Sequence, residues 1–269
     1  MKTFIINLER SKVRRENVTR EVEAQGIDYE LISAVDGSAL SDQQLSDVPM
    51  TEEVRANPNY YTKSVIGAAL SHIRVYQKIV DEKVGLALVM EDDAVLTGNF
   101  ARVLDDVQSK IAVNEIIVFH YMSFRPLILS TVEAQSVGNG FGLYYPVDFS
   151  SVNSGAGYVI TQAAAQSLLS VVSPIQAEAD SWAQFYEQGG FGSIRFVYPM
   201  PLTVRGEKST IAADHQSWLR ARITNIINDY EISPFFEILR YARLKSIKSR
   251  SQVKLIQTQA ASRRVGDYS

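Results

Sequence analysis

Three adjacent acidic residues, Glu91, Asp92 and Asp93, follow an apolar run of strand length. Carboxylates at the end of a buried strand repel one another and lose hydration, so a positive group is expected beside them. In an extended chain Glu91 and Asp93 point to the same side, which predicts that this pair binds one cation. Carboxylate oxygens favour Mg²⁺ or Mn²⁺, and a diphosphate would complete the coordination. The alternative is that the triplet is solvated or caps a turn.

The chain contains three histidines, a residue type that can bind metals or transfer protons. His72 falls within a predicted helix near its core face, where a hydrogen-bonded structural role is expected. His215 follows Asp214 near the end of the main body, and its spacing alone assigns it no role. His120 has no role that the sequence indicates.

The elements around these residues alternate between strands and helices. Strands are predicted at residues 3–8, 29–35, 85–90, 115–119, 142–145 and 158–160. Helices are predicted at residues 11–25, 64–81 and 161–172, with a polar loop carrying short helical pieces at 38–62. This alternation predicts an α/β fold with a mostly parallel sheet, in which ligands bind beyond the carboxyl ends of the strands.

The composition excludes several classes of protein. The 269 residues include no cysteine, which removes disulfides, thiolate metal sites and cysteine nucleophiles. No nucleophile elbow, phosphate-binding loop or dinucleotide fingerprint is present. The N-terminus lacks the features of a signal peptide, and no apolar run approaches the roughly 18 residues of a membrane span. A cytoplasmic protein, soluble or peripheral at a membrane, is therefore expected.

The C-terminal part of the chain is basic, whereas the body is acidic. Residues 240–269 contain eight Lys or Arg and one Asp, although the whole chain has a net charge of −3. Phe236, Leu239, Arg243 and Ile247 recur at helical spacing there, a pattern compatible with an interfacial helix on anionic lipid. A terminal helix packed on the body is the alternative. No nucleic-acid recognition motif accompanies the charge, so nucleic acid is not expected as a partner.

Four motifs in series resemble glycosyltransferase family 25, the lipooligosaccharide-type hexosyltransferases. They lie at residues 6–15, 34–37, 67–73 and 89–94, and the resemblance continues through 153–160 to residue 211. Ala69, Tyr76 and Ala156 depart from the family's usual residues and bear on the acceptor more than on the reaction. The resemblance implies a nucleotide-binding fold of the A type, a UDP-hexose donor and inversion at the anomeric carbon.

The resemblance also implies site residues. Glu91 and Asp93 match the family's acidic metal-binding step, and a cation there would offset the charge on departing UDP. His215 lies where related folds often supply a third metal ligand and is the candidate for that position. The other residues expected to contact the donor are Asn7, Leu8, Arg10, Asp36, Asp92 and Ser209. Asp36-Gly37 is equally a plain turn signal. Arg14 and Arg15 are either further phosphate ligands at the start of a helix or solvated helix charges.

An inverting transfer needs one base to remove a proton from the attacking acceptor hydroxyl. Asp180 matches the family's acidic residue and is the predicted base, with Glu178 and Asp148 as rivals and helix capping as the alternative role. Trp182 and Tyr186, which follow it, are expected to stack on sugar rings.

Taken together, the sequence predicts a catalytic domain at residues 1–232 and a basic helical extension at 233–269. The expected enzyme uses Mn²⁺ or Mg²⁺ to move galactose, or else glucose, from a UDP-sugar to a lipid-linked oligosaccharide at the cytoplasmic face of a bacterial inner membrane. Two alternatives remain. One is a metal-dependent nucleotide-sugar phosphohydrolase, and the other is a nucleotide-sugar-binding protein without catalysis.

Overall fold

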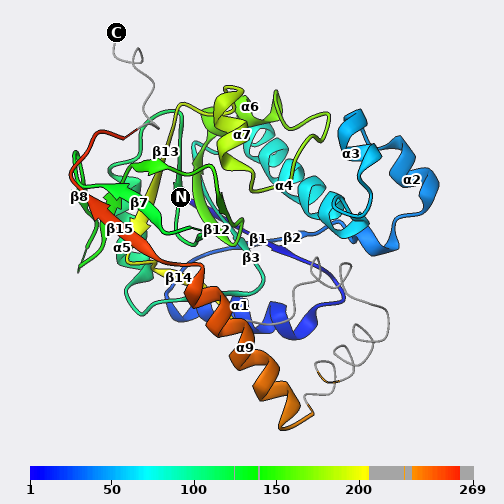
Figure 1. The fold of residues 1–269 in the computed structure, drawn as a ribbon, viewed down its shortest axis with the longest axis horizontal. Coiled ribbons are helices and arrows are strands. Elements are labelled where there is room, and N and C mark those ends of the chain that lie inside the picture. The colour runs from blue at the N-terminus through cyan, green and yellow to red at the C-terminus, as the bar shows by residue number, and fades with distance from the viewer. Residues whose placement is uncertain (124, 139, 206–226, 228–231, 261–269) are drawn as a thin grey trace.

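The computed structural model describes residues 1–123, 125–138, 140–205, 227 and 232–260. Its centre is a sheet of eight strands in the order β2-β1-β3-β12-β5-β13-β9-β8 (Figure 1). In chain order these strands are β1 (Lys2–Asn7), β2 (Glu30–Ser33), β3 (Leu86–Glu91), β5 (Glu115–Val118), β8 (Gln135–Ser136), β9 (Gly142–Tyr144), β12 (Gly157–Thr161) and β13 (Ser193–Tyr198).

Six of these eight strands run in one direction. β1 pairs in parallel with β2 and β3, and β13 pairs in parallel with β5. β12 lies between β3 and β5 and is antiparallel to both, while β9 is antiparallel to β13 and β8. The predicted α/β fold with a mostly parallel sheet is confirmed, and the inserted β12 is the feature that periodicity did not predict.

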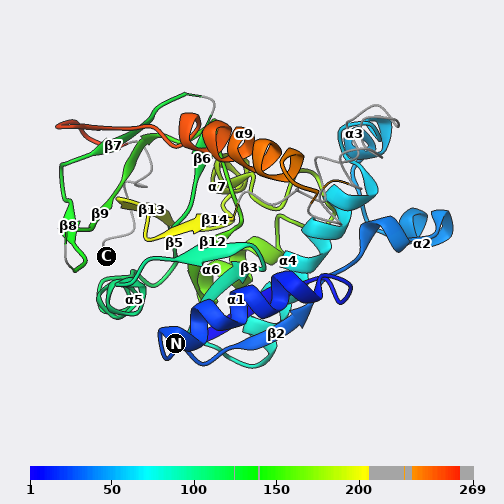
Figure 2. The ribbon, with the colours of Figure 1, turned by 90° about the horizontal axis from the view of Figure 1, so that it is seen from below.

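Helices cover both faces of the sheet (Figure 2). Phe4 and Ile6 of β1 face a core that includes α4 (Lys63–Asp81), α6 (Gln162–Leu169) and α7 (Trp182–Glu187). Ile5 points to the other face, where α1 (Lys12–Ala24) and α5 (Phe100–Gln108) pack. The alternation of side chains along each strand thus explains the apolar runs, because both faces are buried.

The polar stretch after β2 forms the short helical pieces that were predicted: η1 (Gly37–Ala39), α2 (Asp42–Asp47) and α3 (Glu52–Ala56). Short strands outside the main sheet were not predicted. They are β4 (Ala94–Leu96) with β14 (Leu202–Val204), β6 (Met122–Ser123) with β11 (Val152–Asn153), and β7 (Leu127–Ser130) between β10 (Pro146–Asp148) and β15 (Val253–Ile256).

The C-terminal extension contains the expected helix, α9 (Phe235–Ser249), and also strand β15. β15 pairs in parallel with β7, so the extension adds a strand to a sheet of the body. The sequence did not indicate this strand, since two or three alternating residues within a basic segment carry little signal. The boundary at residue 232 stays a prediction.

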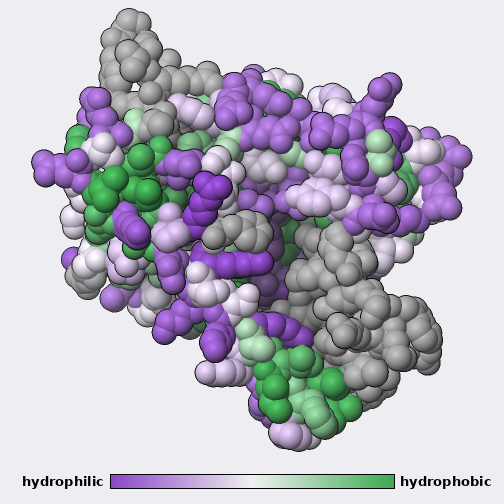
Figure 3. Space-filling model, viewed as in Figure 1, coloured by the Kyte–Doolittle hydropathy of each residue, from purple (hydrophilic) through white to green (hydrophobic). Residues whose placement is uncertain are grey.

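The residues of α9 that recur at helical spacing, Phe236, Leu239, Arg243 and Ile247, are half-buried. A different set is exposed: Phe235 by 56%, Ile238 by 59% and Tyr241 by 69%. Figure 3 shows apolar side chains gathered over the N-terminal half of this helix. Among the described helices, none has the length and hydropathy needed to cross a membrane.

Candidate active site

The carboxyl ends of the central strands place the predicted site residues along one edge of the sheet. Asn7 ends β1, Glu91 ends β3, and His120 follows β5. Because β12 is antiparallel, the loop that precedes it reaches the same edge. A pocket of about 100 Å³ opens there, lined by Ile6, Leu8, Arg10, Arg14, Ala34, Val35, Asp36, Gly37, Ser64, Ala68, Ser71, His72, Glu91 and Asp92. It brings together Leu8, Arg10, Asp36, Glu91 and Asp92, five of the residues predicted to contact a donor.

The acidic triplet does not continue as an extended strand. The chain turns at Asp92 and Asp93 between β3 and β4, so the premise that Glu91 and Asp93 share one side of a strand is wrong. Arg14 reaches both turn residues, with Nη1 at 2.9 Å from Asp92 Oδ1 and Nη2 at 2.9 Å from Asp93 Oδ2. The Asn7 side-chain amide donates to Asp92 Oδ2 at 2.7 Å.

Arg14 therefore supplies positive charge at the acidic step. Its side chain is only 17% exposed, which excludes the interpretation of Arg14 as a solvated helix charge. A guanidinium suits two neighbouring carboxylates because its donors are fixed in a plane. Arg15 is half-buried and lies outside the lining of the pocket.

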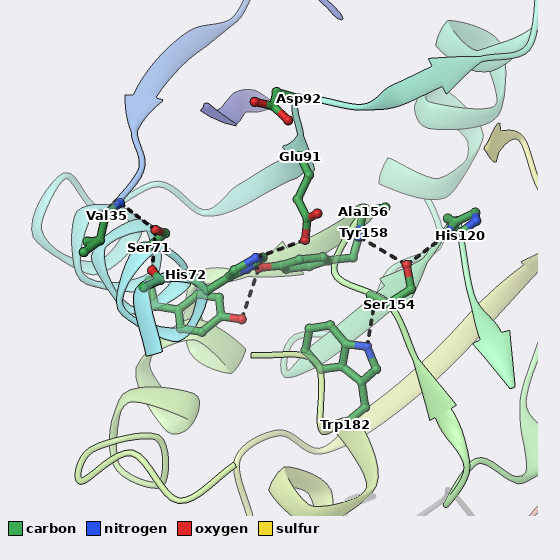
Figure 4. Close-up of polar contacts among 12 residues, drawn as sticks. Val35, Ser71, His72, Glu91, Asp92, His120, Ser154, Ala156, Tyr158 and Trp182 are labelled. Atoms are coloured by element: carbon green, nitrogen blue, oxygen red, sulfur yellow. Dashed lines mark hydrogen bonds and ion pairs between the residues drawn. The ribbon is translucent and has the colours of Figure 1, made fainter. Parts of the chain in front are cut away.

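Glu91 points away from Asp92 and toward His72 (Figure 4). Glu91 Oε1 lies 3.6 Å from His72 Nε2, and the Glu91 side chain is 41% exposed. Burial raises the pKa of Glu91, but the neighbouring His72 and Arg14 outweigh burial and hold the pKa below its ordinary value. Glu91 is thus an ionised carboxylate in the pocket wall. His72 is also held from behind, since its Nδ1 lies 2.8 Å from the Tyr158 hydroxyl, in agreement with the predicted structural role.

The loop before β12 passes directly beneath this pair. A Cβ atom on Gly155 would lie 2.8 Å from Glu91 Oε1 and 3.1 Å from His72 Cε1, so only glycine fits without displacing them. Ser154 fixes the same loop. Its hydroxyl lies 2.7 Å from His120 Nδ1, and its carbonyl accepts a hydrogen bond from the Trp182 indole at 3.3 Å (Figure 4).

Asp36 and Arg10 form the outer wall of the pocket. They are ion-paired, and Asp36 also accepts a hydrogen bond from the Ser38 amide at 3.1 Å, which begins η1. Asp36 therefore begins a turn and also lines the pocket, so its predicted turn role and its predicted position at the donor site are compatible.

Asp180 lies two residues before Trp182, the first residue of α7, and is half-buried. The helix-capping alternative is not supported, because Ser181 is the N-cap residue and no side-chain cap hydrogen bond is made. Burial, followed by the charges of Glu178 and Glu91, raises the pKa of Asp180 to about 7. A carboxylate with a pKa near neutrality suits a general base.

The rivals of Asp180 have other partners. Glu178 Oε2 accepts from the Asn153 side-chain amide at 3.3 Å. Asp148 is exposed on β10, where it accepts from the Ser150 amide at 2.8 Å. The prediction that Trp182 stacks on a sugar is wrong, since Trp182 is 0% exposed and packs edge-on against Tyr158. Tyr186 is half-buried against Phe149 and Phe191.

Two of the predicted residues, Ser209 and His215, lie outside the described residues. Within the described part of the chain, no three side chains of His, Asp or Glu are grouped so as to hold a metal ion by themselves. Sequence reasoning missed the roles of His120 and Ser154 at the site. The position of His120 directly after a predicted buried strand was the available signal.

Comparisons with known proteins identify a family and several relatives. A family described as glycosyltransferase family 25 (LPS biosynthesis protein) matches residues 1–183. Procollagen galactosyltransferase 2 of Mus musculus is 35% identical over 38% of this chain and 17% of its own length. A glycosyltransferase 25 family member of Aedes aegypti is 35% identical over 39% of this chain and 19% of its own length. The chain thus matches less than a fifth of these relatives' length.

Among solved structures, a glycosyltransferase involved in glycosylation of the major capsid of PBCV-1 superposes with a TM-score of 0.32. It is 10% identical, and the superposition covers 70% of this chain and 75% of that one. The family match extends over more than half of the chain and includes β1, the Arg14 helix, the acidic turn and Asp180. The chain belongs to glycosyltransferase family 25.

Proposed function

We propose that this protein transfers a hexose from a UDP-sugar to a saccharide acceptor of the lipooligosaccharide or lipopolysaccharide type, with inversion at the anomeric carbon. The observation that carries the proposal is the pocket at the carboxyl ends of β1, β2 and β3, which gathers Leu8, Arg10, Asp36, Glu91 and Asp92. Open α/β sheets bind nucleotides at this edge. The family match gives the same reaction class.

The donor would lie across this pocket with its diphosphate toward the acidic turn. The pocket of about 100 Å³ has room for part of a nucleotide-sugar, so the remainder of the donor extends beyond it. Arg10 and Arg14 lie on its wall near the start of α1, and a helix N-terminus with arginines favours phosphate. Asn7 and Asp36 would hold the nucleoside.

The residues fit an oxygen-liganded divalent cation at Glu91, since its carboxylate is ionised, 41% exposed and part of the pocket wall. One oxygen of Asp93 is engaged by Arg14 at 2.9 Å, so Asp93 would bind through its other oxygen or after Arg14 moves. Bound Mn²⁺ or Mg²⁺ supplies Lewis acidity that offsets the negative charge on departing UDP. Arg14 adds fixed positive charge at the same step.

Asp180 would accept the proton of the acceptor hydroxyl. It lies close enough to Glu91 and His72 for their charges to affect its pKa. Transfer then follows a balanced course: the acceptor oxygen forms the new glycosidic bond, the bond to UDP breaks, and the hydroxyl proton passes to Asp180.

Galactose is the proposed hexose and glucose the second choice. The relatives from mouse and human are named galactosyltransferases, which supports galactose. The family description names lipopolysaccharide biosynthesis, which supports a lipid-linked saccharide acceptor. We place the reaction in the cytoplasm at the inner membrane, with the basic C-terminal segment and the exposed apolar residues of α9 against anionic lipid.

The test is UDP release from a panel of UDP-sugars with Mn²⁺, Mg²⁺ or EDTA, with and without a lipooligosaccharide acceptor. Glu91→Gln and Asp180→Asn are expected to lower turnover by about 10²–10⁴-fold. The matched control is Asp148→Asn, which replaces an exposed side chain of β10 and should leave turnover unchanged. Donor breakdown without an acceptor requirement would favour the phosphohydrolase, and binding without turnover would favour the nucleotide-sugar-binding protein.

A further inference from the structure

A second and larger cavity lies between the body and the C-terminal segment. Its volume is about 870 Å³, and its lining comes from the end of β13, from β14, from α9 and from the chain through β15. The donor pocket has about 100 Å³ and shares none of these residues. A cavity of this size accommodates an oligosaccharide rather than a single small ion.

The charge of this cavity is one-sided. Lys245, Lys248 and Lys254 line it, and no acidic side chain does so among the described residues. The three ammonium groups form no hydrogen bond or ion pair with any residue that the structure describes. Three ammonium groups of one sign repel one another when no anion is nearby, so the cavity favours a negatively charged ligand.

The rest of the lining suits a sugar. Tyr198 and Met200 offer half-buried apolar surface, and Thr203 adds a hydroxyl group. An aromatic ring provides a flat apolar surface with a polar tip, and hydroxyl groups exchange hydrogen bonds with a saccharide. The ligand indicated is therefore a saccharide that carries an anionic group.

His120 connects this cavity with the loop before β12, which passes close to Glu91. His120 lines the cavity and is 0% exposed, and its Nε2 has no hydrogen-bond partner among the described residues. Its Nδ1 lies 2.7 Å from the Ser154 hydroxyl, and the Ser154 carbonyl accepts from Trp182, two residues after Asp180. A buried polar atom without a partner is costly, so a ligand hydroxyl at Nε2 would satisfy it.

We propose that this cavity is the acceptor site and that it selects an acceptor bearing a phosphate or carboxylate, which Lys245, Lys248 and Lys254 bind while a sugar hydroxyl meets His120. The inference rests on the proposed transfer reaction and names the substrate class of its second substrate. α9 and β15 are thereby substrate-binding elements and not only a membrane anchor.

The test uses the full chain with UDP present and measures binding of glucose 6-phosphate and of glucose by NMR titration. We expect the phosphorylated sugar to bind about tenfold more tightly, and the double variant Lys245→Gln/Lys248→Gln to abolish that preference. Arg74→Gln is the matched control, because Arg74 is exposed on α4 and lines neither cavity. UDP affinity should be the same in all three proteins.

Each other outcome overturns the inference in a distinct way. Equal binding of the two sugars means that the cavity does not select an anionic group. Loss of UDP affinity in the lysine variant means that the cavity holds the donor diphosphate. If the wild-type chain shows no preference between the two sugars and the lysine variant loses binding to phosphatidylglycerol vesicles, the lysines contact the lipid surface. Failure of the wild-type chain to bind UDP-sugars would instead contradict the proposed function, independently of the sugar titrations.

Discussion

At the scale of single residues, the site depends on carboxylates whose environments differ. Asp92 and Asp93 share an ion pair with Arg14, Glu91 faces His72, and Asp180 is affected by burial and by the negative charges of Glu178 and Glu91. The positive charges beside Asp92, Asp93 and Glu91 stabilise the ionised form of these carboxylates. The ionised form of Asp180 is instead destabilised, so this residue binds a proton more tightly than an ordinary carboxylate, and its charge destabilises the folded state above neutral pH.

Asp180→Asn should therefore stabilise the protein at neutral and alkaline pH, although it lowers turnover. The pKa of Asp180 is about 7 in the folded chain, against an ordinary 3.8. Between these values the folded state holds a proton that the unfolded state has lost, so stability falls as pH rises from about 4 to 7. The variant should gain on the order of 2 kcal/mol over the native chain at pH 8 and little at pH 4.

Thermal unfolding of both proteins across this pH range, with EDTA present, measures the effect. Asp148→Asn is the control. Hydrogen bonds from Ser150 lower the pKa of Asp148, so its ionised form is favourable and the variant should gain no stability at pH 8. An equal loss of stability in Asp180→Asn at every pH would mean that Asp180 is a structural hydrogen-bonding group.

Arg14→Lys should weaken the donor site even though it preserves the charge. One ammonium cannot reproduce the planar contacts at 2.9 Å to both Asp92 and Asp93. We expect UDP-sugar affinity to fall about tenfold in calorimetric titrations. Arg15→Lys, at the neighbouring position outside the pocket lining, should leave affinity unchanged. The same loss in both variants would indicate a general charge effect of α1.

At the scale of elements, the pocket depends on how closely η1 approaches α4. A Cβ atom on Gly37 would lie 1.8 Å from the Lys63 carbonyl oxygen, and one on Gly67 would lie 2.7 Å from the Val35 carbonyl oxygen. The Ser71 hydroxyl accepts a hydrogen bond from the Val35 amide at 2.8 Å and ties the two segments together. These contacts set the position of Asp36 in the pocket wall.

Gly37→Ala should separate η1 from α4. We expect a loss of about 1–3 kcal/mol in the free energy of unfolding and weaker UDP-sugar binding, since the added methyl group meets backbone that cannot rotate away. Urea unfolding measures the first effect and calorimetry the second. Gly85→Ala is the control, because nothing lies within 4 Å of its added Cβ. Equal stability of the two variants would show that the backbone adjusts without cost.

The long elements were predictable from the sequence because their signals are local. Apolar periodicity and caps located α1 and α4 to within one residue at most ends. The insertion of β12 between β3 and β5 was not predictable, since strand order depends on contacts between distant segments. The same limit applies to the candidate site. The strand-end rule found Asn7 and Glu91, but the pairing of Arg14 with the acidic turn required the fold.

At the scale of the whole molecule, the C-terminal segment carries two surfaces with different chemistry. Lys245, Lys248 and Lys254 line the inner cavity. Phe235 and Ile238, near the N-terminal end of α9, are exposed by 56% and 59%. The apolar residues that the sequence assigned to lipid contact are instead the half-buried side of α9. A membrane interaction must therefore involve the outer, exposed side.

Phe235→Ser/Ile238→Ser should lower partition of the full chain onto phosphatidylglycerol vesicles by about tenfold or more, because each apolar side chain that enters the interface contributes to binding. Co-sedimentation with vesicles measures this. The matched control is Val13→Ser/Val113→Ser, which replaces valines exposed by 66% and 84% elsewhere on the body. Transfer to a soluble acceptor should stay normal in both variants, because neither pair lines the donor pocket or the lysine cavity. Equal vesicle binding by the two variants would contradict membrane contact through this face of α9.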